Sequence, residues 1–144
     1  MANFRKLRVW QSAEALAIDA HRIATRMRGG RSATLRDQLE RAAMSVPTNI
    51  VEGSAHASPA EFGRFLRYAL ASATEVEGHA QLARDLGLMT EHDFAALLGR
   101  VVDVRMMLHG LLKSLAPPAG KQRQRSPNER VLVNGEREAG SGKR

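Results

Sequence analysis

The sequence contains no cysteine, and this absence removes several kinds of chemistry at once. Without thiols there is no disulfide framework, no cysteine nucleophile and no cysteine-ligated zinc. No stretch approaches the roughly 18 uninterrupted apolar residues of a membrane span, so no membrane partner is expected. The first ten residues, MANFRKLRVW, are charged and lack the apolar run of a signal peptide. These absences together predict a cytoplasmic protein.

Residues 1–116 also lack the alternation of apolar and polar residues that indicates a β-strand. Their apolar residues instead recur at steps of three and four. Four segments follow this helical period, at about residues 8–28, 34–52, 58–86 and 90–116. Short links between amphipathic helices predict an all-α, antiparallel up-down-up-down four-helix bundle in one domain, 1–116. Residues 117–144 are rich in Pro, Gly, Ser, Arg and Lys, and we predict a disordered basic tail.

The second predicted helix contains a proline and is followed by a glycine. Pro47 has no amide hydrogen, so it removes the helical bond to the Ala43 carbonyl. Ile50 and Val51 continue the apolar side beyond the proline, which predicts a kinked helix rather than an ended one. Gly53 is interpreted as a left-handed residue that caps this helix.

Patterns that indicate catalysis are scarce. The five histidines include no pair that would place two imidazole ligands on one helix face. His79 and Glu75 lie one turn apart, but a metal ion needs three or four ligands. Ser45 has no histidine base at a defined spacing, and RGGRS lacks the strand and lysine of a phosphate-binding loop. We therefore expect a non-enzymatic protein with no catalytic residue, metal or cofactor.

Negative charge is scarce in two parts of the chain, which leaves the protein with a net charge of +7. The net charge is +6 in residues 1–36 and +4 from Pro117 onward, whereas residues 37–116 carry −3. Such asymmetry favours a polyanionic partner such as RNA, although a solvated surface accounts for it equally well. The residues proposed to contact nucleic acid are Arg5, Lys6, Arg8, Arg22, Arg26, Arg28, Arg31 and Arg36. Because exposed aromatics for base stacking are nearly absent, sequence-specific readout is not expected.

Polar residues follow one face of each of the two central helices. They are Arg41, Ser45, Asn49 and Glu52 on one helix, and Arg64, Tyr68 and Glu75 on the other, where Ser72 and His79 share the same face. Antiparallel pairing about the turn near Gly53 predicts Arg41 opposite Glu75, and Asn49 level with Arg64 or Tyr68. We interpret the set as an interhelix polar network that specifies register. A binding site is the alternative interpretation.

The last predicted helix carries more apolar residues than one core-facing stripe needs. Leu98, Val102 and Met106 lie outside that stripe, and we predict that they form a homo-oligomer interface. A wide intramolecular core face is one alternative. The other is a scaffold that docks a partner protein through the same residues.

Three segments carry a family resemblance: LRVWQSAEAL (7–16), QLERAAMSVPTNIVEG (38–53) and EFGRFLRYALASATEVEGHAQLARDLG (61–87). Together they resemble the 23S rRNA intervening-sequence family, whose second helix follows a pattern similar to Q-x-x-RA-x-x-S-[IV]-P-x-N-I-x-EG. The resemblance covers residues 4–116. It implies a small bacterial four-helix bundle that forms ring-like homo-oligomers, notably pentamers, with no established enzymatic activity. A more distant resemblance is to the accessory protein of diversity-generating retroelements, which binds nucleic acid and a reverse transcriptase.

Overall fold

The computed structural model describes residues 3–27, 29–56 and 58–118, and it places four α-helices in them. A short 3-10 turn, η1 (Phe4–Lys6), precedes α1 (Arg8–Arg26), and a second, η2 (Gly30–Ser32), joins α1 to α2 (Ala33–Ser54). The remaining helices are α3 (Pro59–Asp85) and α4 (Glu91–Leu115). The all-α prediction is confirmed for this part of the chain, whereas the predicted disordered tail lies outside it from residue 119 onward.

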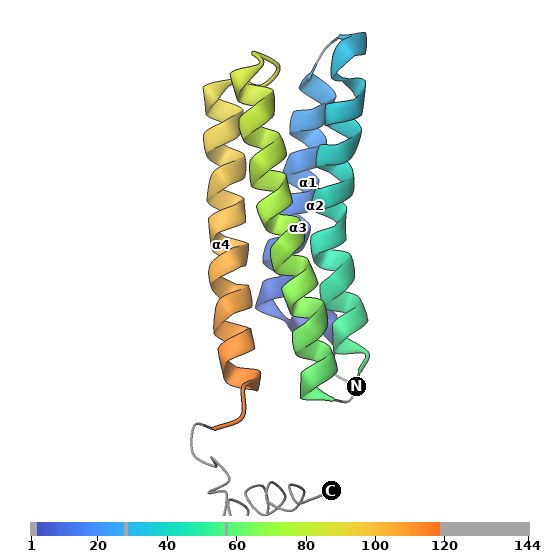
Figure 1. The fold of residues 1–144 in the computed structure, drawn as a ribbon, viewed down its shortest axis with the longest axis vertical. Coiled ribbons are helices and arrows are strands. Elements are labelled where there is room, and N and C mark those ends of the chain that lie inside the picture. The colour runs from blue at the N-terminus through green and yellow to red at the C-terminus, as the bar shows by residue number, and fades with distance from the viewer. Residues whose placement is uncertain (1–2, 28, 57, 119–144) are drawn as a thin grey trace, which may run out of the picture.

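Successive helices run in alternating directions (Figure 1). Each helix packs against its neighbours in sequence, and α4 returns to α1, so the four helices form a closed square. One end of the bundle, here called the terminal end, carries η1, the α2–α3 turn and the last turn of α4 (Figure 1). The other end, here called the distal end, carries the α1–α2 and α3–α4 connections.

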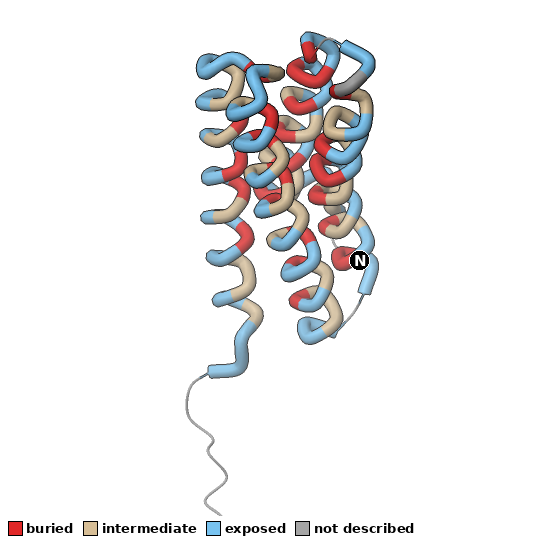
Figure 2. Tube along the Cα trace, turned by 45° about the horizontal axis from the view of Figure 1, so that its top comes forward, coloured by how far each residue is buried: buried red, intermediate tan, exposed pale blue. Residues whose placement is uncertain are grey.

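The core runs along the axis of this square. Buried residues line the inward side of every helix, and exposed residues line the outward side (Figure 2). Its largest fully buried aliphatic side chains include Leu16, Leu39, Ile50, Leu66, Leu97 and Leu108. Four buried alanines in α3, Ala69, Ala73, Ala80 and Ala83, take little space and allow close helix approach. Burial of this apolar stripe, at about 25 cal/mol per Å² removed from water, is the main force that holds the bundle together.

Local signals set the helix boundaries. The hydroxyl of Ser58 accepts a hydrogen bond from the Glu61 amide at the start of α3, where Pro59 occupies the first position. Thr90 does the same for the Asp93 amide at the start of α4. Gly29 and Gly87 follow α1 and α3 with φ of 110° and 73°, values that side-chain-bearing residues rarely adopt.

Gly53 has a different role from the one predicted. It lies inside the last turn of α2, which ends at Ser54, and it is buried. Its φ is not among the positive values found for glycines in the described residues, so the left-handed cap is wrong. A Cβ at this position would stand 2.8 Å from Phe62 Cδ2 and 2.8 Å from Phe65 Cβ. Glycine is required because α3 crosses α2 too closely for any side chain.

Pro47 lies within α2, and the helix continues for seven residues beyond it, which confirms that the proline does not end the helix. Polar side chains beside Pro47 donate to nearby backbone carbonyls. Thr48 Oγ1 bonds the Met44 carbonyl at 2.9 Å, and Asn49 Nδ2 bonds the Ser45 carbonyl at 2.8 Å. Such bonds back to the preceding turn are associated with bent helices, and the kink stays a prediction.

Candidate functional site

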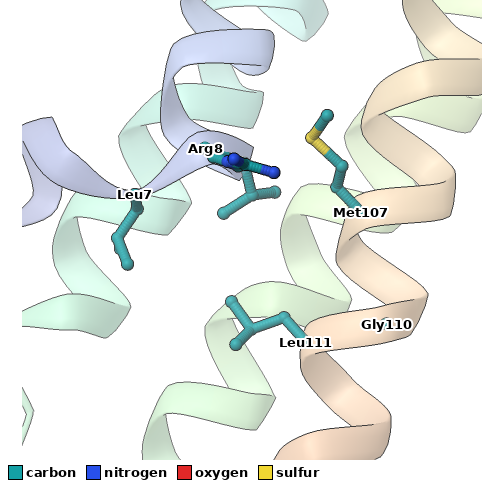
Figure 3. A pocket seen from close by; sticks show the side chains of 6 residues that line it. Leu7, Arg8, Met107, Gly110 and Leu111 are labelled. Carbon is teal, nitrogen blue, oxygen red and sulfur yellow. The ribbon is translucent and has the colours of Figure 1, made fainter.

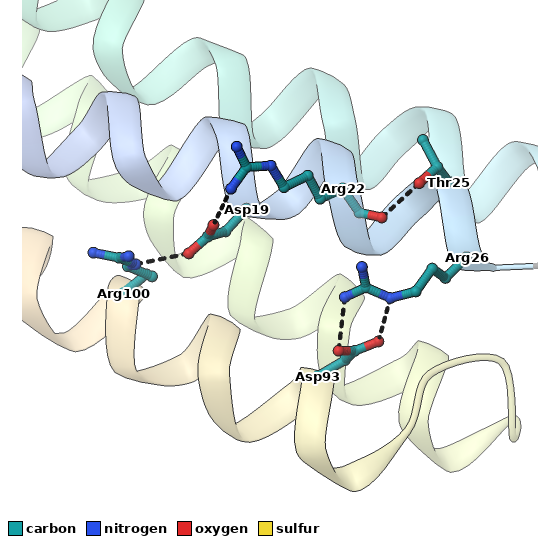
Figure 4. Close-up of polar contacts among 6 residues, drawn as sticks. All are labelled: Asp19, Arg22, Thr25, Arg26, Asp93 and Arg100. Carbon is teal, nitrogen blue, oxygen red and sulfur yellow. Dashed lines mark hydrogen bonds and ion pairs between the residues drawn. The ribbon is translucent and has the colours of Figure 1, made fainter.

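The arginines of α1 near the distal end are paired with acidic residues (Figure 4). Arg26 binds both carboxylate oxygens of Asp93 on the first turn of α4, at 2.8 and 3.1 Å. The hydrogen bond from Arg26 lowers the pKa of the Asp93 carboxyl, and the pairing raises the pKa of Arg26. This two-point contact joins the end of α1 to the start of α4, so the Arg26 guanidinium has an acidic partner although its side chain is 57% exposed.

Asp19, two turns before Arg26 on α1, contacts two further arginines. Arg100 Nε donates to Asp19 at 2.8 Å, and Arg22 Nη1 lies 3.8 Å from the same carboxylate (Figure 4). Arg36 donates from Nη1 to the Met27 carbonyl at the end of α1. Arg22, Arg26 and Arg36 therefore have partners within the bundle, which does not favour their predicted role on nucleic acid. Arg28 and the Arg31 side chain lie outside the described residues.

The terminal end has a different balance of charge. Residues 3–10, 50–56, 58–69 and 108–118 hold six basic residues and two acidic ones. The basic residues are Arg5, Lys6, Arg8, Arg64, Arg67 and Lys113. Among the residues that the structure describes, Arg64 is the one of these six that forms an ion pair, with Glu61 at 2.8 Å. Among the described residues, the predicted basic side chains thus divide into a distal group with partners in the bundle and a terminal group, Arg5, Lys6 and Arg8, that forms no ion pair.

Two grooves flank the last turns of α4 at the terminal end. One, of about 360 Å³, lies between Leu7 to Val9 and the α4 residues Met107, Gly110 and Leu111. Arg8 and Met107 face one another across it (Figure 3). The other, of about 340 Å³, lies between the start of α3 and the end of α4, and Arg67 lines it. Each groove therefore combines apolar walls with one arginine.

The predicted polar face between α2 and α3 contains two contacts that cross between the helices. Arg41 Nη2 donates to Glu75 Oε1 at 2.8 Å, which confirms the predicted pairing. The hydroxyls of Ser45 and Ser72 lie 2.8 Å apart. Both members of the ion pair are about half exposed, with 54% and 40% of the side-chain surface accessible. The contacts fix the register of α2 against α3 at the surface.

The remaining members of the predicted network bond within their own helices or face solvent. Asn49 donates to the carbonyl and hydroxyl of Ser45. Arg64 pairs with Glu61, and its Nη1 lies 3.5 Å from the Tyr68 hydroxyl. Glu52 is exposed. The set is therefore a short interhelix contact with separate neighbours rather than one continuous network.

The outward face of α4 carries exposed apolar residues, as the sequence indicates. Met106 is 69% exposed and Val102 is 41% exposed, whereas Leu98 is half-buried. Gly99 and Gly110 lie on the same side of the helix, and an added Cβ would meet nothing within 4 Å at either. The alternative that these residues extend the internal core is wrong for Val102 and Met106.

Some contacts were missed by the sequence analysis. Ser72 was placed on the polar face of the third helix, but its contact with Ser45 was not predicted. The partners of Arg26 and Arg100 lie 67 and 81 residues away, and no local spacing reveals them. The described residues hold no cluster of three or more His, Asp or Glu suited to a metal ion. In the same residues, no helix has the length and apolarity that crossing a membrane demands.

The family model described as 23S rRNA-intervening sequence protein matches residues 5–110, which is most of the chain. The chain belongs to the 23S rRNA-intervening sequence protein family. No protein with a curated description matches it. Among solved structures, it is similar to a Bacteroides thetaiotaomicron protein of unknown function from the S23 ribosomal protein family. That match has a TM-score of 0.68 at 20% identity and covers 73% of this chain and 98% of the other.

The likeness to the Bacteroides protein shows the shared bundle fold alone, because identity is low. The family match ends at residue 110, so it includes all but the last turns of α4. Both the distal ion pairs and the α2–α3 contact fall within the matched residues of this 23S rRNA-intervening sequence family member.

Proposed function

We propose that this family member is a non-enzymatic, homo-oligomeric protein that binds RNA or another nucleic acid through the terminal end of its bundle. The observation that carries the proposal is the difference between the two ends. The distal arginines Arg26 and Arg36 are held by internal partners. At the terminal end, Arg5, Lys6, Arg8, Arg67 and Lys113 are exposed and form no ion pair with another described residue.

Cations of this kind suit phosphate contacts. Each lysine or arginine that neutralises a phosphate releases condensed counterions, and the gain in affinity falls as salt concentration rises. α4 ends at this same end of the bundle (Figure 1). The sequence at 121–125 is the basic stretch KQRQR, which would add further phosphate contacts to those of the bundle.

A pair of matched charge variants tests the site. Arg5→Gln/Lys6→Gln removes two terminal cations, and Arg22→Gln/Arg84→Gln removes two distal ones. Binding of fluorescein-labelled RNA should be followed by anisotropy between about 50 and 200 mM salt. The terminal variant should bind more weakly and reduce the salt slope by about 1.4 to 1.8, whereas the distal variant should keep the slope. No binding of the wild type at the low salt concentration would refute the proposal.

The homo-oligomer is supported by the outward face of α4. An exposed apolar stripe that includes Val102 and Met106 is unfavourable in water and favourable when covered. Gly99 and Gly110 leave room beside these residues for the close approach of another helix. A second copy of the chain carries the same stripe and can bury it symmetrically.

Light scattering at micromolar concentration measures the mass directly and tests this part. We expect a mass of several times 15.8 kDa. A monomeric mass would refute self-association through α4. In that case, the apolar face would favour the alternative of a scaffold that docks a partner protein.

A further inference from the structure

Five of the six aromatic residues of the protein lie at the terminal end, although they are scattered in the sequence. They are Phe4, Trp10, Phe62, Phe65 and Tyr68, and Phe94 is at the distal end. The sequence suggests that aromatics for base stacking are nearly absent. Among the described residues, Tyr68 is the one exposed Phe, Trp or Tyr, at 47%, so the expectation is confirmed apart from this ring. The fold places Tyr68 beside the other aromatics of the terminal end.

The cluster at the α2–α3 turn consists of His56, Arg64, Phe65 and Tyr68, and we call it the turn cluster. The His56 ring lies parallel to the Phe65 ring within 16°, with 5.1 Å between centroids. Tyr68 meets Phe65 edge to face at 5.9 Å. The Arg64 guanidinium lies over both rings, 5.0 Å from the Phe65 centroid and 5.7 Å from that of Tyr68.

Packing holds the turn cluster in place. Phe65 is fixed by its contact with Gly53, where the missing side chain lets the two helices approach. Glu61 binds Arg64 at 2.8 Å and so orients its guanidinium over the rings. His56 and Tyr68 are exposed on either side of the half-buried Phe65. The arrangement is a fixed aromatic surface with two accessible rings and an adjacent cation.

A second pairing of arginine and aromatic ring lies on the other flank of α2. Phe4 meets Trp10 edge to face at 5.1 Å, and the Arg5 guanidinium lies 4.7 Å from the centroid of Phe4. The turn η1, which contains Phe4 and Arg5, packs against α2 as well as α1. The end of α2 is therefore flanked by two sites where a cation accompanies an aromatic ring.

We propose that the turn cluster stacks an unpaired base, so that the protein prefers single-stranded RNA to a duplex. The proposal rests on the proposed function, since it refines which nucleic acid the terminal end binds. Every base has a π-face that can stack on an exposed aromatic ring, but in a duplex those faces are already stacked on one another. Arg64 and Arg67 on the same helix supply cations for the phosphates beside the stacked base.

The experiment compares a labelled single-stranded oligouridylate of about 16 nucleotides with a duplex of equal length, by anisotropy at fixed salt. Tyr68→Leu removes the exposed ring and keeps an apolar side chain. It should weaken single-strand binding about tenfold and leave duplex binding and the salt slope unchanged. Phe94→Leu is the matched control at the distal end and should change neither affinity. A melting curve for each variant establishes that it is folded.

The two proposals fail in different ways. Equal affinity for both RNAs, or a Tyr68→Leu variant that binds the single strand as the wild type does, would overturn the stacking site. If Arg5→Gln/Lys6→Gln still weakened binding in that case, the proposed function would stand without the turn cluster. A wild-type protein that binds neither RNA at low salt would overturn both.

Discussion

Two glycines of this bundle differ in the space around them, although both lie within helices. Gly53 touches Phe62 and Phe65 so closely that a Cβ would stand 2.8 Å from each. Gly78 in α3 is exposed, and an added Cβ would meet nothing within 4 Å. The same substitution should therefore have opposite effects at these two positions.

Gly53→Ala should lower the free energy of unfolding by about 1–3 kcal/mol, because overpacking forces α3 away from α2. Gly78→Ala should raise it by about 0.5–1 kcal/mol, since alanine loses less conformational freedom in a helix than glycine does. Urea unfolding followed by circular dichroism measures both. A stabilised Gly53→Ala protein would contradict the close approach of the two helices.

The bond between Asp93 and Arg26 predicts a pH dependence of stability. Because Arg26 lowers the pKa of Asp93 in the folded protein, the unfolded chain binds a proton at higher pH than the folded chain. The stabilisation is complete above the unfolded pKa, near 3.9, and is lost as pH falls through the lower folded pKa.

Asp93→Asn should accordingly melt at a lower temperature than the wild type at pH 7, and the difference should diminish as pH falls below about 4. Glu91→Gln on the same turn is the control, since Glu91 is exposed and lies 3.8 Å from its nearest cation. A difference that persisted undiminished at pH 2 would show that the carboxylate charge is not responsible.

At the scale of the helices, the contact between Arg41 and Glu75 sets register more than stability. Both side chains remain about half exposed, so water and salt screen the pair. A double-mutant cycle with Arg41→Gln and Glu75→Gln should give a coupling energy of about 0.2–1 kcal/mol that shrinks in high salt. Thermal unfolding at low and high salt provides the measurement. A coupling several times larger would indicate that the pair is shielded from water.

The sequence predicts the helices well because the three- and four-residue period and the caps are local. Ser58 and Thr90 cap α3 and α4 as their positions suggest, and antiparallel pairing about one turn correctly places Arg41 beside Glu75. The prediction for Gly53 was wrong because the sequence alone does not distinguish a glycine that ends a helix from a glycine that lies where two helices cross. The position of the opposing helix is needed to tell them apart. For the same reason, the sequence alone did not identify Asp93 as the partner of Arg26.

At the scale of the whole molecule, charge and apolar surface occupy different places. Unpaired cations and aromatic rings gather at the terminal end, whereas the apolar stripe runs along the outside of α4. If copies associate through α4 with their helix axes pointing the same way, their terminal ends would lie side by side. Each additional copy would then add phosphate contacts to one continuous basic surface, which raises overall affinity without new kinds of contact.

Met106→Glu tests this arrangement by putting a charge into the proposed interface. Met106 is 69% exposed, so the substitution should leave the monomer folded while it lowers the mass measured by light scattering. Leu82→Glu is the control, since it puts the same charge on a 49% exposed apolar residue of α3, outside the α4 stripe. RNA affinity should fall with the loss of assembly. An unchanged mass for Met106→Glu would place the contact between copies elsewhere.

The position of the first and last described residues has a practical consequence. Asn3 precedes η1 and Pro118 follows α4, and both η1 and the end of α4 lie at the terminal end of the bundle with the α2–α3 turn (Figure 1). An affinity tag, fluorophore or sensor attachment placed directly next to Asn3 or Pro118 would therefore crowd the surface whose binding is being measured. A label in the α3–α4 connection, near Gly87, would instead sit about 35–40 Å away, the length of a bundle helix of about 25 residues.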